Sequence, residues 1–330
     1  MSTAPDDVTT HPADDGLRTW RPVSTLPGAV YHADEIWDRE RAQLFAREWI
    51  YVARDEEFPE PGDRLVRALA GMPVLLVRGA GGDVGAYHAR DRRPAHAVTV
   101  AGFVFVSLAP EPEPFDAYCA RNPEGDIRET IARWRPEELR IAHTIVYEVA
   151  ANWKIVTENY NECLHCPTIH PELVKLVPLF RTGVTEGEEG AELAHGATSF
   201  TVSGRSDRPP LPGLAPADIT SYNGNHVFPT LMINLHSDCV MTYRLEPISP
   251  VRTRVVSEFC FHPDTIARPD FDPSDIVGFW DLISKQDWAV CERAQLGVAS
   301  RAYARGGVHP FNDRWIAAFN ERYRDGIELG

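Results

Sequence analysis

The sequence predicts an α+β fold built around antiparallel sheets, and two observations support this prediction. Four segments, at 63–69, 72–80, 82–89 and 101–109, alternate apolar and polar residues, which is the period of half-buried strands. Three further strand-like segments lie between 226 and 263, and one long amphipathic helix follows them. Strands that are grouped together, with helices before and after them, are typical of α+β proteins.

Local patterns predict the remaining elements. Residues 34–54 repeat apolar side chains at helical spacing, starting from Asp34 as a candidate cap. A Pro-rich joint at 110–118 is followed by a helical stretch at 123–135 and by a strand at 142–153. The strand leads directly into the motif that carries the candidate chemistry.

These patterns divide the chain into three parts. The polar, Pro-rich residues 1–25 are expected to be a disordered tail. A small β region spans 26–108, and a larger domain, which includes the long helix at 273–300, spans 109–330. A chain of 330 residues that is 43% hydrophobic can bury a sizeable core.

Composition and charge exclude several classes of function. The net charge of -15 and the pI near 5.2 argue against binding to the phosphates of nucleic acid or of an anionic membrane. The start of the chain, "MSTAPDDVTTHPADDGL", lacks an apolar run, and no later segment is suited to span a bilayer, so a cytoplasmic protein is expected. Without a secretion signal, the cysteines are interpreted as thiols rather than as a disulfide framework. These are Cys119, Cys163, Cys166, Cys239, Cys260 and Cys291.

The stretch "ENYNECLHCPTIHPEL", at 158–173, concentrates candidate metal ligands. A helix that continues to Pro167 places Glu162 and His165, three residues apart, on one face. His170 follows the break, and a bend at Pro167 lets the two imidazoles converge. Two neutral imidazoles and one carboxylate from elsewhere, on one side of an ion, form the arrangement of non-haem Fe(II) sites that activate oxygen.

Other sites use the same residue types. A zinc site would need four ligands within eight residues, which suits tetrahedral geometry poorly. The four candidates for it are Cys163, His165, Cys166 and His170. A Cys–His nucleophilic pair has no oxyanion hole that the sequence indicates. We therefore interpret Cys163 and Cys166 as packing residues behind the site.

The segment "NWKIVTENYNECLHCPTIHPEL" resembles the iron-site helix of the Rieske non-haem iron oxygenases, the large subunits of aromatic-ring-hydroxylating dioxygenases. The similarity is greatest to the branch that acts on glycine betaine, choline and carnitine. It extends in order through "LFAREWIYVAR", "PGDRLVRALAGMPVLLVR", "GFVFVSLAP", "HSDCVMTYRLEPISPVRTRV" and "FWDLISKQDWAVCERAQLGVASRAY". The resemblance implies a helix-grip catalytic domain preceded by an all-β Rieske domain.

The resemblance also implies a set of metal ligands. His165 and His170 match the two histidine ligands, and Asp287 in "QDW" matches the carboxylate ligand. Asp281 and Glu292 are the alternatives if the alignment of that helix has slipped.

Three further residues have implied roles in catalysis. Glu162 matches the acid that links the iron site to a cluster in a neighbouring subunit. Asn159 and Asn161 are expected to orient the iron ligands.

One part of the family pattern is missing. The family holds a [2Fe-2S] cluster through a Cys-x-His pair and a Cys-x-x-His pair. The matching stretch, "AYHARDRRPAHAVTVAGFVFVSL", keeps His88 and His96, but no cysteine precedes Cys119. We therefore expect a truncated Rieske-like region at 26–108 without a cluster, and mononuclear Fe(II) as the cofactor of the chain.

A chain without a cluster must obtain its electrons from another protein. The expected partners are a cluster-containing Rieske oxygenase subunit or a ferredoxin and reductase, in a trimeric ring that includes a different subunit. The expected reaction is hydroxylation, or demethylation through hydroxylation, of a small amine, betaine or aromatic substrate with O2. The rival hypotheses are a catalytically silent subunit of such a ring and a hydrolase that uses zinc at the same ligands. The retained acid, histidines and carboxylate favour the catalytic hypothesis, because burying them without a metal is costly.

Aromatic side chains in the matching segments are candidates for a substrate pocket, where they would suit a methylated ammonium group through cation–π attraction. Each of them is also a candidate for ordinary core packing. They are Phe200, Tyr222, Phe228, His236, Tyr243, Trp280 and Trp288.

Overall fold

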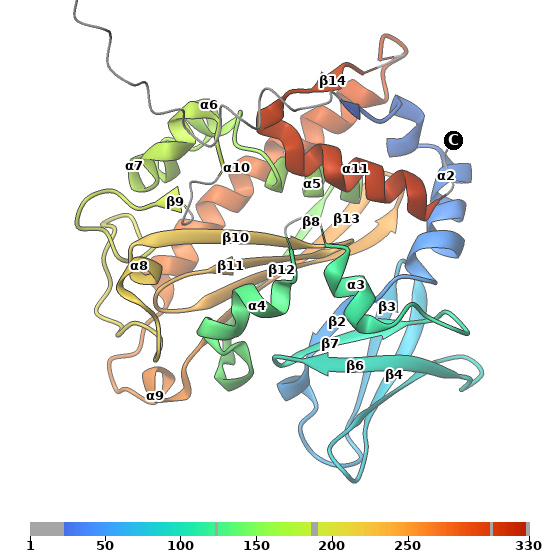
Figure 1. Ribbon diagram of the computed structural model, residues 1–330, viewed down its shortest axis with the longest axis horizontal. Coiled ribbons are helices and arrows are strands. Elements are labelled where there is room, and N and C mark those ends of the chain that lie inside the picture. Colours follow the sequence, from blue (N-terminus) through green and yellow to red (C-terminus); the bar gives the residue numbers. More distant parts are fainter. Residues whose placement is uncertain (1–22, 123–124, 186–190, 304–305, 328–330) are drawn as a thin grey trace, which may run out of the picture.

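The computed structural model describes residues 23–122, 125–185, 191–303 and 306–327. Two six-stranded antiparallel sheets dominate the fold, and most helices lie around the second of them (Figure 1). The α+β class predicted from the sequence is therefore confirmed. Most of the predicted N-terminal tail lies outside the described residues.

The first sheet contains the four strands predicted early in the chain and two others. Its strand order is β2-β7-β6-β5-β4-β3. The strands are β2 (Ile50–Arg54), β3 (Arg64–Leu69), β4 (Met72–Arg78), β5 (Val84–His88), β6 (Pro94–Val100) and β7 (Phe103–Ser107). The prediction of a helix through 34–54 is wrong for β2, because "IYVAR" is buried along its length and its β-branched and aromatic side chains favour a strand.

The first helix is shorter than the sequence suggested. α2 spans Asp34–Arg39, and a π-helical turn, Glu40–Phe45, follows it. Ala33 occupies the N-cap position, so Asp34 is not the cap. Its carboxylate lies in the first turn, where negative charge is favoured by the helix dipole.

The second sheet has the order β8-β13-β12-β11-β10-β9. Its strands are β8 (Arg140–Val149), β9 (Ala191–Glu192), β10 (Ser221–Val227), β11 (Leu231–Leu235), β12 (Val240–Ser249) and β13 (Arg252–Phe261). The three strands predicted between 226 and 263 are β11, β12 and β13, so this prediction is confirmed. A two-stranded ladder joins β1 (Val23–Ser24) to β14 (Val308–His309).

Two helices position the candidate site. α5 (Trp153–Tyr160) is capped by Asn152, whose side chain accepts a hydrogen bond from the amide of Lys154. α10 (Ser274–Val298) packs against α5 and β8. The long helix predicted at 273–300 is thus confirmed, whereas α11 (Arg314–Gly326) was not predicted. The shorter helices are α3 (Phe115–Ala120), α4 (Ile127–Ile131), α6 (Cys166–Ile169), α7 (Leu173–Leu176), α8 (Pro216–Ile219) and α9 (Pro263–Ile266).

The two sheets share their buried side chains. One hydrophobic cluster joins Val52 and Val104 of the first sheet to Val255 of the second, and another joins Phe105 to Ile233. The first sheet therefore packs directly against the part of the chain that carries the site.

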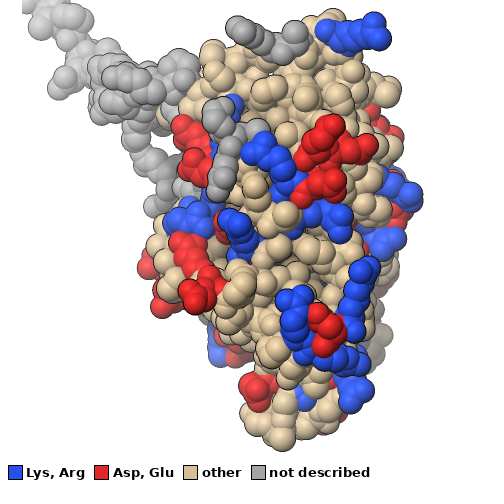
Figure 2. All heavy atoms as spheres, turned by 90° about the vertical axis from the view of Figure 1, so that its right-hand side faces the viewer, with Lys and Arg blue, Asp and Glu red and all other residues tan. Residues whose placement is uncertain are grey.

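The surface on the side of α2 and the first sheet carries charges of both signs. Lys and Arg side chains alternate with Asp and Glu over this face, without a broad field of one sign (Figure 2). None of the helices in the described ranges has the length and apolar character needed to cross a bilayer.

Candidate metal centre

The candidate ligands come from the chain after α5 and from the middle of α10. The sequence predicted a helix as far as Pro167, but α5 ends at Tyr160. The Glu162 carboxylate accepts hydrogen bonds from the backbone amides of Leu164 and His165, the latter at 3.3 Å. Such side-chain-to-backbone bonds compete with the helical pattern, and here they turn the chain toward α10.

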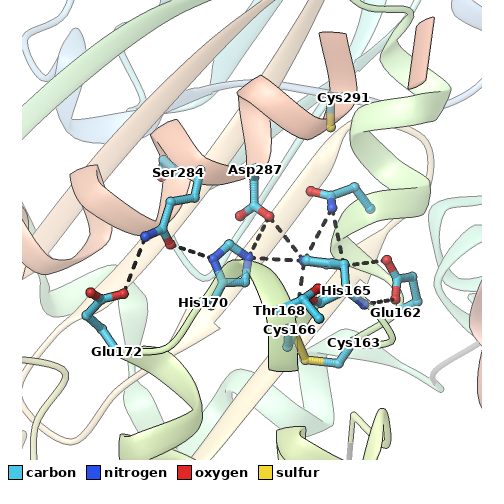
Figure 3. A network of polar contacts seen from close by, with 12 residues as sticks. Glu162, Cys163, His165, Cys166, Thr168, His170, Glu172, Ser284, Asp287 and Cys291 are labelled. Atoms are coloured by element: carbon cyan, nitrogen blue, oxygen red, sulfur yellow. Dashed lines mark hydrogen bonds and ion pairs between the residues drawn. A yellow bond between two sulfur atoms is a disulfide. The ribbon is translucent and has the colours of Figure 1, made fainter. Parts of the chain in front are cut away.

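Three donor atoms converge at this turn. His165 Nε2 lies 3.0 Å from His170 Nε2, and Asp287 Oδ1 lies 3.2 and 2.8 Å from these two nitrogens (Figure 3). Ligands about 2.1 Å from an ion and at right angles to one another are about 3.0 Å apart. The three side chains therefore fit cis positions around a single metal ion. Among the described residues, they form a group of potential metal ligands whose donor atoms lie close to one another.

Hydrogen bonds on the far side of each imidazole aim its Nε2 toward this point. His170 Nδ1 donates to Gln286 Oε1 at 2.7 Å, and the Gln286 amide in turn donates to Glu172 Oε2 at 3.3 Å. His165 Nδ1 donates to Glu162 Oε1. With both Nδ1 atoms protonated, both Nε2 atoms have a free lone pair for a metal.

Gln286 and Glu172 were not found by sequence reasoning. Gln286 directly precedes Asp287, and Glu172 lies two residues after His170. Being next to a ligand in sequence was the only signal for them, and it does not distinguish them from surface residues.

The charges at the centre favour a bound cation. Burial lowers the pKa of His165, but hydrogen bonds to Asp287 and Glu162 outweigh it and raise the pKa to about 9. Burial raises the pKa of Asp287, but its hydrogen bonds to His165 and His170 outweigh this and hold the pKa below its usual range. The carboxylates of Asp287 and Glu162 thus stabilise an extra proton on His165, and a metal ion can take the place of that positive charge.

The other predicted site residues lie around the centre. The Asn159 amide nitrogen lies 3.4 Å from His165 Nε2, and Asn161 is buried at the same cavity. The alternative third ligands lie elsewhere, because Asp281 accepts a hydrogen bond from Tyr147 and Glu292 accepts one from the amide of Ala150. Asp287 is the carboxylate that the fold brings to the histidines.

A cavity of about 300 Å³ adjoins the three side chains. Of the seven aromatic candidates, four line it: Tyr222, Tyr243, Trp280 and Trp288. Phe200 and His236 stack behind them on Trp280, and Phe228 packs against Phe319 instead. Among the described residues, the cavity wall contains two carboxylates, Glu162 and Asp287, and no lysine or arginine.

Comparison with known proteins identifies the family. The family of ring hydroxylating alpha subunits (catalytic domain) matches residues 136–328, which is more than half of the chain. The chain belongs to this family. It is therefore an oxidoreductase catalytic subunit, as the resemblance of its motifs implied, and mononuclear iron is a general feature of its family.

Individual relatives cover nearly the whole of this ring-hydroxylating subunit. The glycine betaine monooxygenase oxygenase subunit of Chromohalobacter salexigens is 23% identical over 94% of this chain and 87% of its own length. The carnitine monooxygenase oxygenase subunit of Acinetobacter pittii is 23% identical over 90% of this chain and 91% of its own.

Solved structures share the fold. The quaternary ammonium Rieske monooxygenase CntA in complex with its substrate gamma-butyrobetaine has a TM-score of 0.70 at 18% identity, covering 94% of this chain and 98% of that one. Naphthalene 1,2-dioxygenase from Rhodococcus sp. bound to indole has a TM-score of 0.65 at 16% identity, covering 92% of this chain and 94% of that one. The catalytic domain with its N-terminal all-β region is therefore the architecture of a Rieske oxygenase.

The cysteines beside the centre differ from the prediction. Cys163 and Cys166 form a disulfide, with their Cα atoms 5.0 Å apart, so interpreting all six cysteines as thiols is wrong for this pair. The early end of α5 is the physical reason, because the tight turn that follows brings the two residues within disulfide range. Cys119, Cys239, Cys260 and Cys291 are free and buried, as expected.

Proposed function

We propose that the chain is the mononuclear non-haem Fe(II) subunit of an oxygenase, in which His165, His170 and Asp287 hold the iron. The observation that carries this proposal is the convergence of one oxygen and two nitrogens within 3.2 Å of one another, beside an aromatic cavity. A site of two imidazoles and one carboxylate leaves positions free for other ligands, as oxygen-activating iron sites do.

The residues of the chain position the metal and shield it. Glu162 and Gln286 fix the tautomers of the two histidines, and the buried His170 cannot easily exchange its partner for water. Fe(II) supplies the activation of O2 when it is bound. The cavity holds the substrate beside the ligands and limits the access of water.

The substrate class proposed here is a small amine or betaine, which is hydroxylated or demethylated through hydroxylation. Aromatic faces of Tyr222, Trp280 and Trp288 beside two carboxylates and without a cationic side chain suit a positively charged methylammonium group. The relatives described above, which are glycine betaine and carnitine monooxygenase oxygenase subunits, agree with this class. An aromatic substrate is the alternative, and the aromatic side chains that line the same cavity would stack on its ring.

The electrons are proposed to come from a cluster-bearing oxygenase subunit or a ferredoxin and reductase. The chain has no cysteine before Cys119, so residues 26–108 cannot supply the two thiolates of a Rieske cluster. His96 contacts the carbonyl of Pro110 at 3.2 Å, and only five residues separate β5 from β6. We accordingly propose that 26–108 is a truncated Rieske-like region and 109–330 the catalytic domain, in a trimeric ring that includes a cluster-bearing subunit.

Metal analysis of anaerobically purified protein tests this function. We expect one iron per chain, no visible absorption from an iron–sulfur cluster, and loss of the iron in His165→Ala, His170→Ala and Asp287→Ala with an unchanged far-ultraviolet circular dichroism spectrum. Asp281→Asn, on the same helix, is the matched control and should keep its iron.

Three results would contradict the proposal. Normal iron content in Asp287→Ala would place the third ligand elsewhere. A Rieske spectrum after reconstitution would refute the missing cluster. A chain that binds no metal under any condition would indicate the silent subunit instead.

A further inference from the structure

Gly224 lies inside strand β10, where a glycine is unfavourable unless another group approaches the backbone closely. Its φ angle lies outside the left-handed region, so an alanine can adopt the same backbone conformation. A Cβ at this position would instead lie 2.6 Å from the Tyr222 hydroxyl oxygen and 3.0 Å from that of Tyr160. The missing side chain at Gly224 therefore makes room for two tyrosines, and all three residues line the metal-site cavity.

Hydrogen bonds hold both tyrosine hydroxyl groups against this part of the sheet. Tyr222 donates to Asn234 Oδ1 at 2.6 Å, and Tyr160 donates to the same oxygen at 3.1 Å. Asn234 lies on β11 directly opposite Gly224 and is fully buried, so the shared acceptor is fixed in place. A side chain at position 224 would occupy the space that the Tyr222 hydroxyl needs to reach this acceptor.

The ring of Tyr222 has packed side chains behind it and the cavity in front of it. Its centroid lies 5.2 Å from that of Phe200 and 5.9 Å from that of His236, and both of these side chains are buried. A close-packed interior yields little to a displaced side chain. A Tyr222 ring that is pushed away from residue 224 therefore moves into the cavity and makes it smaller.

The cavity has room for more than the part of the substrate that reacts. The methyl group that is hydroxylated in the proposed reaction must lie beside His165, His170 and Asp287. The rest of the substrate then extends along walls that carry no ligand, and β10 forms one of them. A cavity of about 300 Å³ is at the lower end of the volumes that take up drug-sized ligands, which are larger than a trimethylammonium group alone.

We propose that Gly224 determines the length of the substrate, because it gives the Tyr222 hydroxyl a place on β10 and so keeps open the part of the cavity beside this strand. The substrate class that follows is a trimethylammonium compound with one substituent longer than methyl, and this substituent lies along β10. The proposal rests on the proposed function, because it takes a methylated ammonium compound as the substrate.

Isothermal titration calorimetry on the anaerobic Fe(II) protein tests the proposal without turnover. The probes are tetramethylammonium, ethyltrimethylammonium and butyltrimethylammonium, which have the same charge and differ in the length of one chain. The wild-type chain should bind the butyl compound more tightly than the tetramethyl compound, because each buried CH2 group adds to the affinity. Gly224→Ala should lower the ratio of the butyl to the tetramethyl affinity about tenfold, which is the effect of about one methylene group in a hydrophobic pocket.

The ratio of affinities is the readout because Tyr222 also contacts the ammonium group in the proposed function. Gly224→Ala combined with Tyr222→Phe removes the oxygen that lies 2.6 Å from the added Cβ, so it should recover part of the lost ratio. Tyr222→Leu shortens this wall and should raise the ratio above that of the wild type, which tests the proposal even if Gly224→Ala does not fold. Gly278→Ala, on α10, is the matched control and should keep the wild-type ratio, because a Cβ there meets nothing within 4 Å.

The outcomes separate this inference from the proposed function. The same ratio in Gly224→Ala and in the wild type, or in Tyr222→Leu and in the wild type, overturns the role of Gly224 and leaves the proposed oxygenase in place. If the iron-loaded wild-type chain binds none of the three ammonium probes, the proposed substrate class is wrong and this inference fails with it.

Discussion

Replacing Gln286 by leucine should weaken metal binding about 10–100-fold, because it removes the partner that orients His170. The His170 Nδ1 proton is donated to Gln286 at 2.7 Å, and His170 is only 1% exposed, so water cannot take over as acceptor. A tenfold change corresponds to about 1.4 kcal/mol, so the expected loss is about 1.4–2.7 kcal/mol. This agrees with the cost of about 1–3 kcal/mol for a buried N–H that loses its partner.

The affinity can be measured anaerobically by competition with a chelator of known affinity for Fe(II) or cobalt. Lys285→Leu is the matched control, since Lys285 is the preceding residue on α10 but its side chain is exposed and pairs with Asp281. Gln286→Glu keeps an acceptor for the His170 proton but loses the donor to Glu172, so it should retain more of the affinity than Gln286→Leu does and less than the wild type. The reasoning is refuted if Gln286→Leu folds normally and binds the metal within twofold of the wild-type affinity.

Three other predictions concern the surroundings of the site. Lys154→Met should lower the free energy of unfolding, measured by chemical denaturation, by about 3–5 kcal/mol, because it leaves the buried Glu40 carboxylate without its ammonium partner. The double variant Lys154→Met with Glu40→Gln should recover part of that loss, and a Lys154→Met variant as stable as the wild type contradicts the prediction. Burial raises the pKa of Glu158 from 4.5 to about 7, so the folded state keeps this proton to higher pH than the unfolded state does. The protonated Glu158 contributes its full stability below about pH 4.5, and this contribution, at most about 3 kcal/mol, is lost as the pH rises through about 7. Glu158→Gln should therefore flatten the fall of Tm between pH 5 and 8. Parallel Tm curves for the variant and the wild type would contradict this prediction. Glu162→Gln should keep the metal but slow electron delivery from a cluster-bearing protein in stopped-flow measurements, and equal rates would exclude Glu162 from the electron path.

Much of the fold could be predicted from local patterns. Period-2 alternation located the strands at 63–69 and 72–80, and helical periodicity located α10 within two residues at each end. The errors lie where tertiary contacts override such patterns. "IYVAR" forms β2 rather than a helix because its backbone pairs with β7 and its side chains are buried, Tyr51 in a cluster with the second sheet. α5 ends early because the Glu162 carboxylate bonds to the amides after it.

The sequence by itself determined the types of ligand at the metal centre. His165 and His170 were recognisable from their spacing around Pro167, and Asp287 only from the resemblance of several ordered motifs to one family. Tertiary structure alone decided that Gln286 orients His170, that Asp281 and Glu292 point elsewhere, and that Cys163 and Cys166 are joined. The physical reason is that periodicity reports which residues share a face of one element. Which side chains meet across 117 residues of sequence, as His170 and Asp287 do, depends on how α10 packs against α5.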